Sequence, residues 1–454
     1  MSADHRICAA CVGDAFLKDE IEKSVVVNEA CHYCASIRAT VGLGSLADRC
    51  NTVIQQFYEV SSLTNAVVIY DREPDGAPLL DVLDQILEPT NEVLEDLAAL
   101  LEDQWFDFDT QQSQFGEEPW FVEKSKCAEP LNTLWESMED SLRNEARFIN
   151  PAAARVLETV FGPILNDRGR TGSPVVVEVG PGGAMDTVFR ARVFQSMSVM
   201  HDALAHPERH IGSRPQGSGP PGRMNAKGVS VFYGSTDKDI AIAEVRPPVG
   251  SHVVVALFKI VRKLRLLDLH ELGSISLKPG SSYFDPLTFD QAARRDFLEI
   301  LTQRVVMPVM PEMEEQGYLI TQAIADFLST HPTLGLDGIL FPSAQDTSPS
   351  IKTSARNVIL FNKAAAVGNA ERNMGKTTVN LYEFDEDSSW FEPEIWSSPP
   401  ETDDFPDLPD WGDRKQRVPS LELDRNAIEI HYISGVTYMK NTYPVKHRVF
   451  NPKK

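Results

Sequence analysis

The chain of 454 residues carries 66 acidic and 43 basic side chains, a formal net charge of −23 at pH 7. Its length is enough for about three domains that each bury a core. The acidity argues against a general nucleic-acid or anionic-membrane partner, because phosphates would be repelled on average. We find neither an apolar leader at the N-terminus nor an apolar run long enough to span a bilayer, and we therefore expect a cytoplasmic protein.

Four of the six cysteines form two identical pairs near the N-terminus. The pairs Cys8-x-x-Cys11 and Cys31-x-x-Cys34 are separated by 19 residues. Such paired knuckles place four thiolates tetrahedrally around one Zn²⁺, whereas two redox CxxC motifs are the alternative. Because four cysteines leave no coordination position open, we predict a closed, structural zinc module over residues 1–40.

Helical periodicity follows over residues 41–168. Apolar residues recur at three- and four-residue steps in the stretches 79–87, 94–101 and 131–142. Asn150 followed by Pro151 is typical of an N-cap with proline at the first helical position. Several amphipathic helices with short connections predict an up-and-down α-helical bundle that serves docking or homo-oligomerisation.

Period-two alternation begins near Pro174. Within Phe189–Val193 this alternation puts Arg190 and Arg192 on one face of a strand. Two guanidiniums on one face suit bidentate binding of a pyrophosphate, and a solvated basic edge is the alternative. The Gly-, Pro- and Ser-rich stretch 212–222 is expected to be a mobile lid over a pocket.

A second compact unit runs from Gly222 to Arg246. The β-branched and aromatic run 229–233 predicts a buried strand that a glycine closes. Asp237 then predicts the N-cap of a short helix that carries Glu244 at its end. Further strands and helices are expected over 253–258, 264–269, 294–304, 318–328, 337–343 and 357–361, which together indicate an α+β domain.

The C-terminal part, residues 367–454, is predicted to be an acidic linker followed by strands. Residues 383–413 hold twelve acids and no Lys or Arg, with prolines between them. This composition favours a solvated linker without a long regular element, and a docking arm for a partner is the alternative. Alternation over 427–438 predicts a terminal hairpin-like pair of strands.

The motifs GRMNAKG, VFYGS and AIAEVRP, with VFRARVF before them and DGILFPSAQ after them, resemble the RES domain. This family is named after an arginine, a glutamate and a serine, and the resemblance covers residues 169–366. It implies an α+β fold that resembles ADP-ribosyltransferase toxins. It also implies an NAD⁺-degrading enzyme, a glycohydrolase or a phosphorylase, of a toxin or defence type with a protein antitoxin or inhibitor as partner.

The resemblance further implies the residues of the site. Glu244, Arg190 and Ser343 are the expected catalytic residues. Glu244 would stabilise positive charge on the ribose, and Ser343 would hold a ribose hydroxyl or the carboxamide, or act as a nucleophile. Tyr233 would stack on the nicotinamide or the ribose. The residues expected to bind NAD⁺ are Arg190, Arg223, Asn225, Tyr233 and Ser235.

The order of the predicted parts is similar to proteins in which a HEPN-type bundle precedes a RES domain. Many HEPN domains are ribonucleases that use an Arg-x₄₋₆-His motif, which the helical region of this chain lacks because it has no histidine after His32. Two other functions stay open for the whole chain. One is ADP-ribose transfer to a protein or an RNA. A second acid two residues before Glu244 would support this function, but Ile242 occupies that position. The other is a non-enzymatic adaptor built from the zinc module and the bundle.

Overall fold

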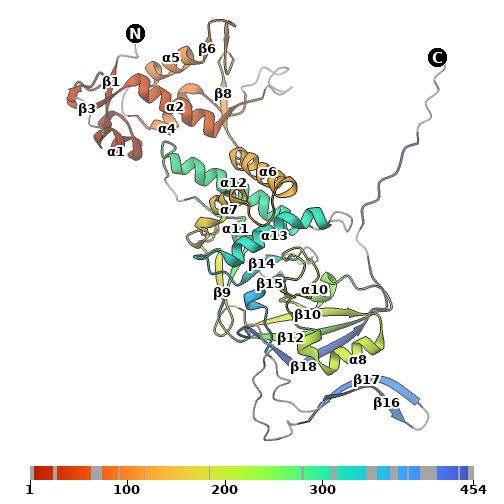
Figure 1. Cartoon of the computed structure of the whole chain (residues 1–454). Helices are drawn as coiled ribbons and strands as arrows, with labels where there is room; N and C mark the ends of the chain where they lie inside the picture. Colours follow the sequence, from red (N-terminus) through yellow and green to blue (C-terminus); the bar gives the residue numbers. More distant parts are fainter. Residues whose placement is uncertain are drawn as a thin grey trace, which may run out of the picture. The chain divides into compact units, whose positions relative to one another are not determined.

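The computed structural model describes residues 5–23, 28–62, 74–89, 93–116, 118–183, 185–277, 281–307, 314–343, 355–368, 377–385, 388–398, 417–437 and 440–447. The chain divides into two compact units (Figure 1). The N-terminal unit comprises Met1–Val175 and Glu271–Val305, and the sheet unit comprises Val176–His270 and Val306–Lys454. Among the described helices, none is both long and apolar enough to cross a membrane.

The N-terminal unit begins with a small three-stranded sheet in the order β1-β3-β2, formed by β1 (Arg6–Cys8), β2 (Asn28–Ala30) and β3 (Ile37–Gly42). A short 3₁₀ turn η2 (Ala9–Cys11) and helix α1 (Ala15–Lys23) connect the first two strands. Both pairings in this sheet are antiparallel. The β1–η2 segment and the turn between β2 and β3 carry the paired cysteines.

The predicted helices of this unit are confirmed. They are α4 (Leu79–Leu87), α5 (Leu94–Trp105), α6 (Glu129–Asn144) and α7 (Pro151–Phe161). Helix α2 (Leu43–Phe57), for which no periodic stretch was identified, precedes them, and the 3₁₀ turn η3 (Gly162–Leu165) follows α7. Asn150 caps α7 as expected, because its side-chain oxygen accepts a hydrogen bond of 2.9 Å from the backbone N–H of Ala153.

The prediction of a purely helical bundle was wrong in one respect, because short strands interrupt the helices. A three-stranded sheet has the order β4-β8-β5, from β4 (Tyr58–Val60), β5 (Ala77–Pro78) and β8 (Trp120–Glu123). A second pair joins β6 (Phe106–Asp107) to β7 (Gln112–Ser113). These strands are only two to four residues long, and their pairing joins segments too far apart for local periodicity to reveal.

Helix α12 (Pro286–Val306) belongs, except for its last residue, to the N-terminal unit although it lies in the middle of the RES-like region. The ring of Phe297 packs against Trp135 of α6 at a centroid distance of 5.1 Å. The guanidinium of Arg294 binds both carboxylate oxygens of Asp167, at 3.1 and 2.6 Å. The core of the N-terminal unit therefore includes a helix contributed from the second half of the chain.

The sheet unit is built on an eight-stranded sheet in the order β18-β12-β10-β11-β15-β14-β13-β9, in which only β13 and β14 run parallel. Its strands are β9 (Val176–Val179), β10 (Thr187–Phe194), β11 (Phe232–Ser235), β12 (His252–Ile260), β13 (Leu264–Asp268), β14 (Gly338–Pro342), β15 (Arg356–Leu360) and β18 (Leu421–Tyr432). Its helices are α8 (Met197–Ala205), α9 (Pro207–His210), α10 (Lys238–Glu244) and α13 (Glu314–Thr330), with the 3₁₀ turn η6 (Asn362–Ala364), and α11 (Leu269–Leu272) contains residues of both units.

The alternation predicted for β10 is confirmed. Phe189, Ala191 and Val193 pack into a small apolar cluster with residues of β12 and α10. Val188 and Phe194 belong to the larger cluster on the other face, together with residues of α8. The two arginines of β10 alternate with the first set and therefore share the face of the second.

The strand predicted over 229–233 was placed too early. Strand β11 begins at Phe232 and includes Gly234 and Ser235, because all four of its residues pair with β15. Gly234 cannot carry a larger side chain here, since a Cβ atom would lie 2.9 Å from the carbonyl oxygen of Phe189. The glycine thus permits close approach of two strands and does not end one.

Two predictions for the C-terminal part were also wrong. The acidic segment does contain regular structure, because β16 (Thr377–Asp385) and β17 (Ser388–Ser397) form an antiparallel hairpin, and residues 399–416 lie outside the described residues. Val379 and Ile395 pack against the larger apolar cluster, which supplies the burial that composition alone did not indicate. The terminal strands are not a hairpin: β18 is a single strand that pairs with the edge of β12.

Strand β18 is fastened to α9 by an ion pair between Arg425 and Glu208. Both nitrogen–oxygen distances are 2.8 Å, and the Glu208 side chain is only 5% exposed. Because removal of one partner leaves a buried charge uncompensated, we expect Arg425→Ala to destabilise the sheet unit by roughly 3–5 kcal/mol. Native-state hydrogen exchange of the β12 and β18 amides would measure this loss.

The matched control is Lys259→Ala, which removes an exposed partner of Asp424 on the same pair of strands. A solvent-exposed ion pair contributes little to stability, so exchange in this variant should be nearly that of the wild type. Equal effects of the two substitutions would contradict the role assigned to the Arg425–Glu208 pair.

Candidate active site and zinc site

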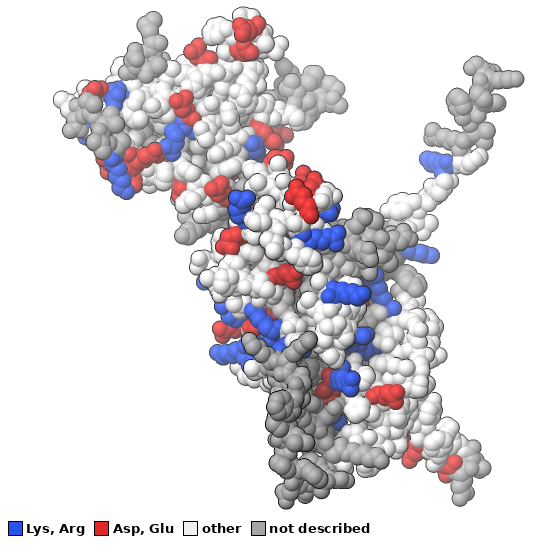
Figure 2. Space-filling view, in the orientation of Figure 1, with Lys and Arg blue, Asp and Glu red and all other residues white. Residues whose placement is uncertain are grey.

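A cavity of about 460 Å³ opens in the sheet unit where β10 and β11 separate. The two strands pair only at Phe189 and Ser235, so the following residues of β10 and the preceding residues of β11 diverge. Arg190 and Arg192 of β10 and Tyr233 of β11 line the cavity. On the face shown in Figure 2, acidic and basic side chains are interspersed. A negative net charge of the whole chain is therefore compatible with a local cluster of arginines in the cavity.

The only acidic side chain among the described residues that line the cavity is Glu244. It is the last residue of α10, whose N-cap is confirmed because Asp237 accepts a hydrogen bond of 3.0 Å from the backbone N–H of Ile240. The hydroxyl of Ser343 and the amide of Asn357 both donate to Oε1 of Glu244, at 2.8 and 2.7 Å. The carboxylate is therefore fixed through one oxygen.

Ser343, which was expected to contact the ligand, lies outside the cavity lining. Ser343 follows β14, is 7% exposed and does not line the cavity. Its hydroxyl proton is directed at Glu244, which makes it an orienting group for that carboxylate and a poor candidate for contact with a ligand. Sequence reasoning missed Asn357, which does line the cavity; a polar residue at the start of the predicted strand 357–361 was the available signal.

Arg190 is 5% exposed, and its Nη1 has no hydrogen-bond partner among the described residues. Its guanidinium carbon lies 4.6 Å from the centre of the Phe232 ring. Burial lowers the pKa of Arg190 well below its usual value, and the charge of Arg192 lowers it further. A buried guanidinium with an unsatisfied nitrogen on a cavity wall is suited to an anionic ligand.

Arg223 also lines the cavity and is positioned by a loop that α13 holds. Thr321 donates a hydrogen bond to the carbonyl of Arg223. The amide of Gln322 donates to the carbonyls of Gly222 and Asn225, at 2.8 and 3.0 Å. These two helix residues were not among the predicted site residues, because nothing in the local pattern of α13 indicates which loop it contacts.

Tyr233 lines the cavity as predicted, but Asn225 does not. The Tyr233 hydroxyl donates to the side-chain oxygen of Asn225 at 2.8 Å, and burial raises the pKa of Tyr233 to about 12. The amide nitrogen of Asn225 donates to the carbonyls of Pro220, Ala226 and Val229. Asn225 thus organises the loop behind Tyr233 and has no free hydrogen-bonding group for a ligand.

Ser235 lines the cavity but its hydroxyl is committed to the fold. The Ser235 Oγ donates to the carbonyl of Arg356 and accepts from the backbone N–H of Asp237, both at 3.2 Å. The expected lid over 212–222 is anchored by hydrogen bonds, including one of 3.0 Å from Gly217 N–H to the carbonyl of Gly228. Its motion as a lid stays a prediction.

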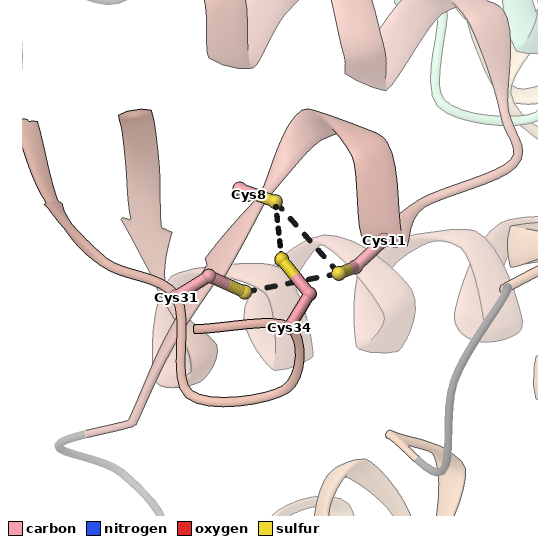
Figure 3. A group of neighbouring side chains, drawn as sticks. All are labelled: Cys8, Cys11, Cys31 and Cys34. Carbon is pink, nitrogen blue, oxygen red and sulfur yellow. Dashed lines mark hydrogen bonds between the residues drawn. The ribbon is translucent and has the colours of Figure 1, made fainter. Parts of the chain in front are cut away.

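The four cysteines of the N-terminal unit converge as predicted (Figure 3). Their sulfur atoms all lie within 4.8 Å of one another. The pairs Cys8–Cys11, Cys8–Cys34 and Cys11–Cys31 are separated by 3.7, 3.6 and 3.7 Å. A tetrahedral Zn²⁺ site with Zn–S bonds of about 2.3 Å requires sulfur atoms about 3.8 Å apart, so the arrangement fits a closed zinc centre.

The surroundings of the cysteines also fit a metal. Cys8, Cys11 and Cys31 are buried, whereas Cys34 is exposed. Burial raises the pKa of the Cys8 thiol, and hydrogen bonds from Ser36 lower the pKa of Cys34 to about 6. Buried thiols with no disulfide partner are stabilised by a cation that they can ligate as thiolates.

We expect Cys8→Ser to lose the metal and to expose the amides of the β1-β3-β2 sheet to exchange, because three thiols cannot complete a closed tetrahedral site. Elemental analysis of the purified protein and hydrogen exchange would measure both effects. Cys127→Ser, which alters a buried cysteine outside the cluster, is the control and should retain one Zn²⁺ per chain. Wild-type protein without zinc would refute the assignment.

A comparison with protein families identifies the region that contains the cavity. The model of the RES domain matches residues 188–381, which include all described residues named above as lining the cavity. No curated protein and no solved structure matches the chain. Strand β18 lies beyond the match, although it belongs to the same sheet. The motifs around Arg190, Glu244 and Ser343 thus belong to the region of this chain, residues 188–381, that matches the RES domain.

Proposed function

We propose that the sheet unit binds NAD⁺ and cleaves the bond between nicotinamide and ribose. RES domains are associated with NAD⁺-related toxin activity. The observation that carries the proposal is the position of Glu244, a carboxylate fixed through one oxygen on the wall of a cavity that also contains Arg190, Arg192, Arg223 and Arg246. One negative charge among several cations suits a substrate that is anionic at its phosphates and becomes cationic at its ribose.

The arginines account for binding. Arg190 and Arg223 would hold the pyrophosphate, because guanidiniums form paired hydrogen bonds with phosphate oxygens. Tyr233 and Tyr318 offer aromatic surfaces on the cavity wall for the nicotinamide or the ribose. A volume of about 460 Å³ lies within the range of ligand pockets.

Glu244 accounts for the chemistry. As the bond between ribose C1′ and the nicotinamide nitrogen breaks, its electron pair moves to the ring and neutralises the pyridinium charge. Positive charge then appears at C1′, where a carboxylate stabilises it electrostatically. An oxygen of water or of phosphate forms the new bond to C1′ and releases its proton to solvent, so that the enzyme is a glycohydrolase or a phosphorylase.

The same arrangement favours a small acceptor over a macromolecular one. Ile242 occupies the position two residues before Glu244, and it packs against the small apolar cluster of β10 and β12. No second acid is therefore available there to activate an acceptor on a protein or RNA. Because unrestrained loss of NAD⁺ harms a cell, we also propose a toxin or defence role in the cytoplasm, with a protein inhibitor as partner.

Glu244→Gln should keep the hydrogen-bonded shape of the site but lose turnover by about 10²-fold or more, because the stabilising charge acts mainly in the transition state. NAD⁺ affinity measured by calorimetry should stay close to that of the wild type. Nicotinamide release measures the turnover. Glu178→Gln, an exposed acid on β9, serves as the control and should retain full activity.

Arg190→Ala should behave differently, because an arginine that holds the phosphates in the ground state and in the transition state contributes uniform binding. The change should appear chiefly in KM. Turnover of NAD⁺ by Glu244→Gln at the wild-type rate would exclude Glu244 as the stabilising group. A wild-type protein that neither binds nor cleaves NAD⁺ would favour the adaptor alternative.

Asn357→Asp tests the orientation of Glu244. The substitution places a second carboxylate where an amide donates to Oε1 at 2.7 Å. Two carboxylates that share a site do not both ionise easily, so the acidic limb of the pH–kcat profile should move to higher pH. Asn380→Asp on β16 is the exposed control and should leave the profile in place. An unshifted profile for Asn357→Asp would contradict an orienting role for Asn357.

A further inference from the structure

Two guanidiniums of β10, those of Arg190 and Arg192, line the cavity, and Arg214 lies on the neighbouring loop outside the cavity lining. Arg190 and Arg192 share a face of β10. Burial lowers the pKa of both guanidiniums, and the charge of Arg214 lowers both further. In the described part of the chain, no carboxylate forms an ion pair with any of the three. Repulsion between the buried Arg190 and the half-buried Arg192 is unfavourable unless a bound anion offsets it.

Arg192 has the geometry of an incomplete anion site. Its Nη2 donates to the carbonyl of Gly212 at 3.2 Å, whereas its buried Nε has no partner among the described residues. Arg214 is exposed two residues further along the same loop. The carbonyl of Arg214 accepts a hydrogen bond from Ser230, so the backbone that presents its guanidinium is held in place. One loop thus fixes Arg192 and carries Arg214.

The positive charge exceeds what one pyrophosphate offsets. A pyrophosphate diester carries two negative charges, and the proposed function assigns it to Arg190 and Arg223. Arg192 and Arg246 remain in the cavity lining, where Glu244 supplies one negative charge, and Arg214 adds a further cation on the neighbouring loop. The surplus is at least one cation, next to the dinucleotide and on the side of the 212–222 loop.

We propose that Arg192 and Arg214 form an additional phosphate subsite beside the pyrophosphate. Its occupant is a phosphate group, either the 2′-phosphate of NADP⁺ or inorganic phosphate bound together with NAD⁺. A phosphate held between the two guanidiniums accepts a hydrogen bond from the unpartnered Nε of Arg192. Its negative charge also offsets the repulsion between Arg192 and Arg214. The location beside the pyrophosphate rests on the proposed function, but occupation of the subsite by phosphate alone does not.

The first experiment measures binding without turnover. Calorimetric titrations of the full-length protein with inorganic phosphate, NAD⁺ and NADP⁺ are compared at constant ionic strength in a phosphate-free buffer. Arg214→Gln should weaken phosphate or NADP⁺ binding about tenfold or more, the loss expected when one charge-assisted contact is removed. Lys263→Ala, which removes an exposed cation on the turn between β12 and β13, is the control and should not change either affinity.

The outcomes separate the two sources of phosphate. Tighter binding of NADP⁺ than of NAD⁺, with the preference lost in Arg214→Gln, identifies the 2′-phosphate. Saturable binding of inorganic phosphate that Arg214→Gln weakens, without a preference for NADP⁺, identifies a separate anion. Turnover of NAD⁺ with neither effect would overturn the subsite and leave the proposed function standing. Phosphate binding that depends on Arg214 in a protein that binds no dinucleotide would support the subsite and contradict the function.

Discussion

The site depends on the two hydrogen bonds that Oε1 of Glu244 accepts from Ser343 and Asn357. The three residues come from the end of α10, the end of β14 and β15, so their arrangement exists only when the sheet has formed. Both donors are neutral, and they restrict the carboxylate without cancelling its charge. A fixed negative charge of this kind stabilises a developing cation without reorganisation at the moment of reaction.

The arginines of the cavity require a stabilising contribution from elsewhere in the sheet, because buried guanidiniums destabilise a fold that lacks their anion. The sheet meets this requirement on the other face of β10, where Phe189 and Val193 pack into an apolar cluster with β12. β12 is in turn paired along nine residues with β18, which extends the sheet beyond the RES match. We infer that this C-terminal strand stabilises the strand whose arginines face the cavity, although it supplies no described residue to the cavity lining.

Sequence patterns predicted a structural feature correctly where residues close in the chain determine that feature. The spacing of the cysteines, the N-caps at Asn150 and Asp237, and the alternation that pairs Arg190 with Arg192 were all read correctly from the sequence. The hydrogen bonds of Ser343 and Asn225 were not predicted, because the contacts of Ser343 with Glu244 and of Asn225 with Val229 form only in the folded chain. Motif resemblance selects such residues without distinguishing a group that contacts substrate from one that orients its neighbours.

Chain connectivity limits how the two units can be separated. The chain leaves the sheet unit after His270 and re-enters it at Val306, and in between it contributes α12 to the N-terminal unit. A fragment that began at residue 169 would carry α12 without Trp135 and Asp167, which contact it. The apolar face of that helix would then be exposed, with the unpaired Arg294 beside it. The full chain is therefore the physical unit in which the cavity and the four-cysteine cluster should be studied, even though each is built within one unit alone.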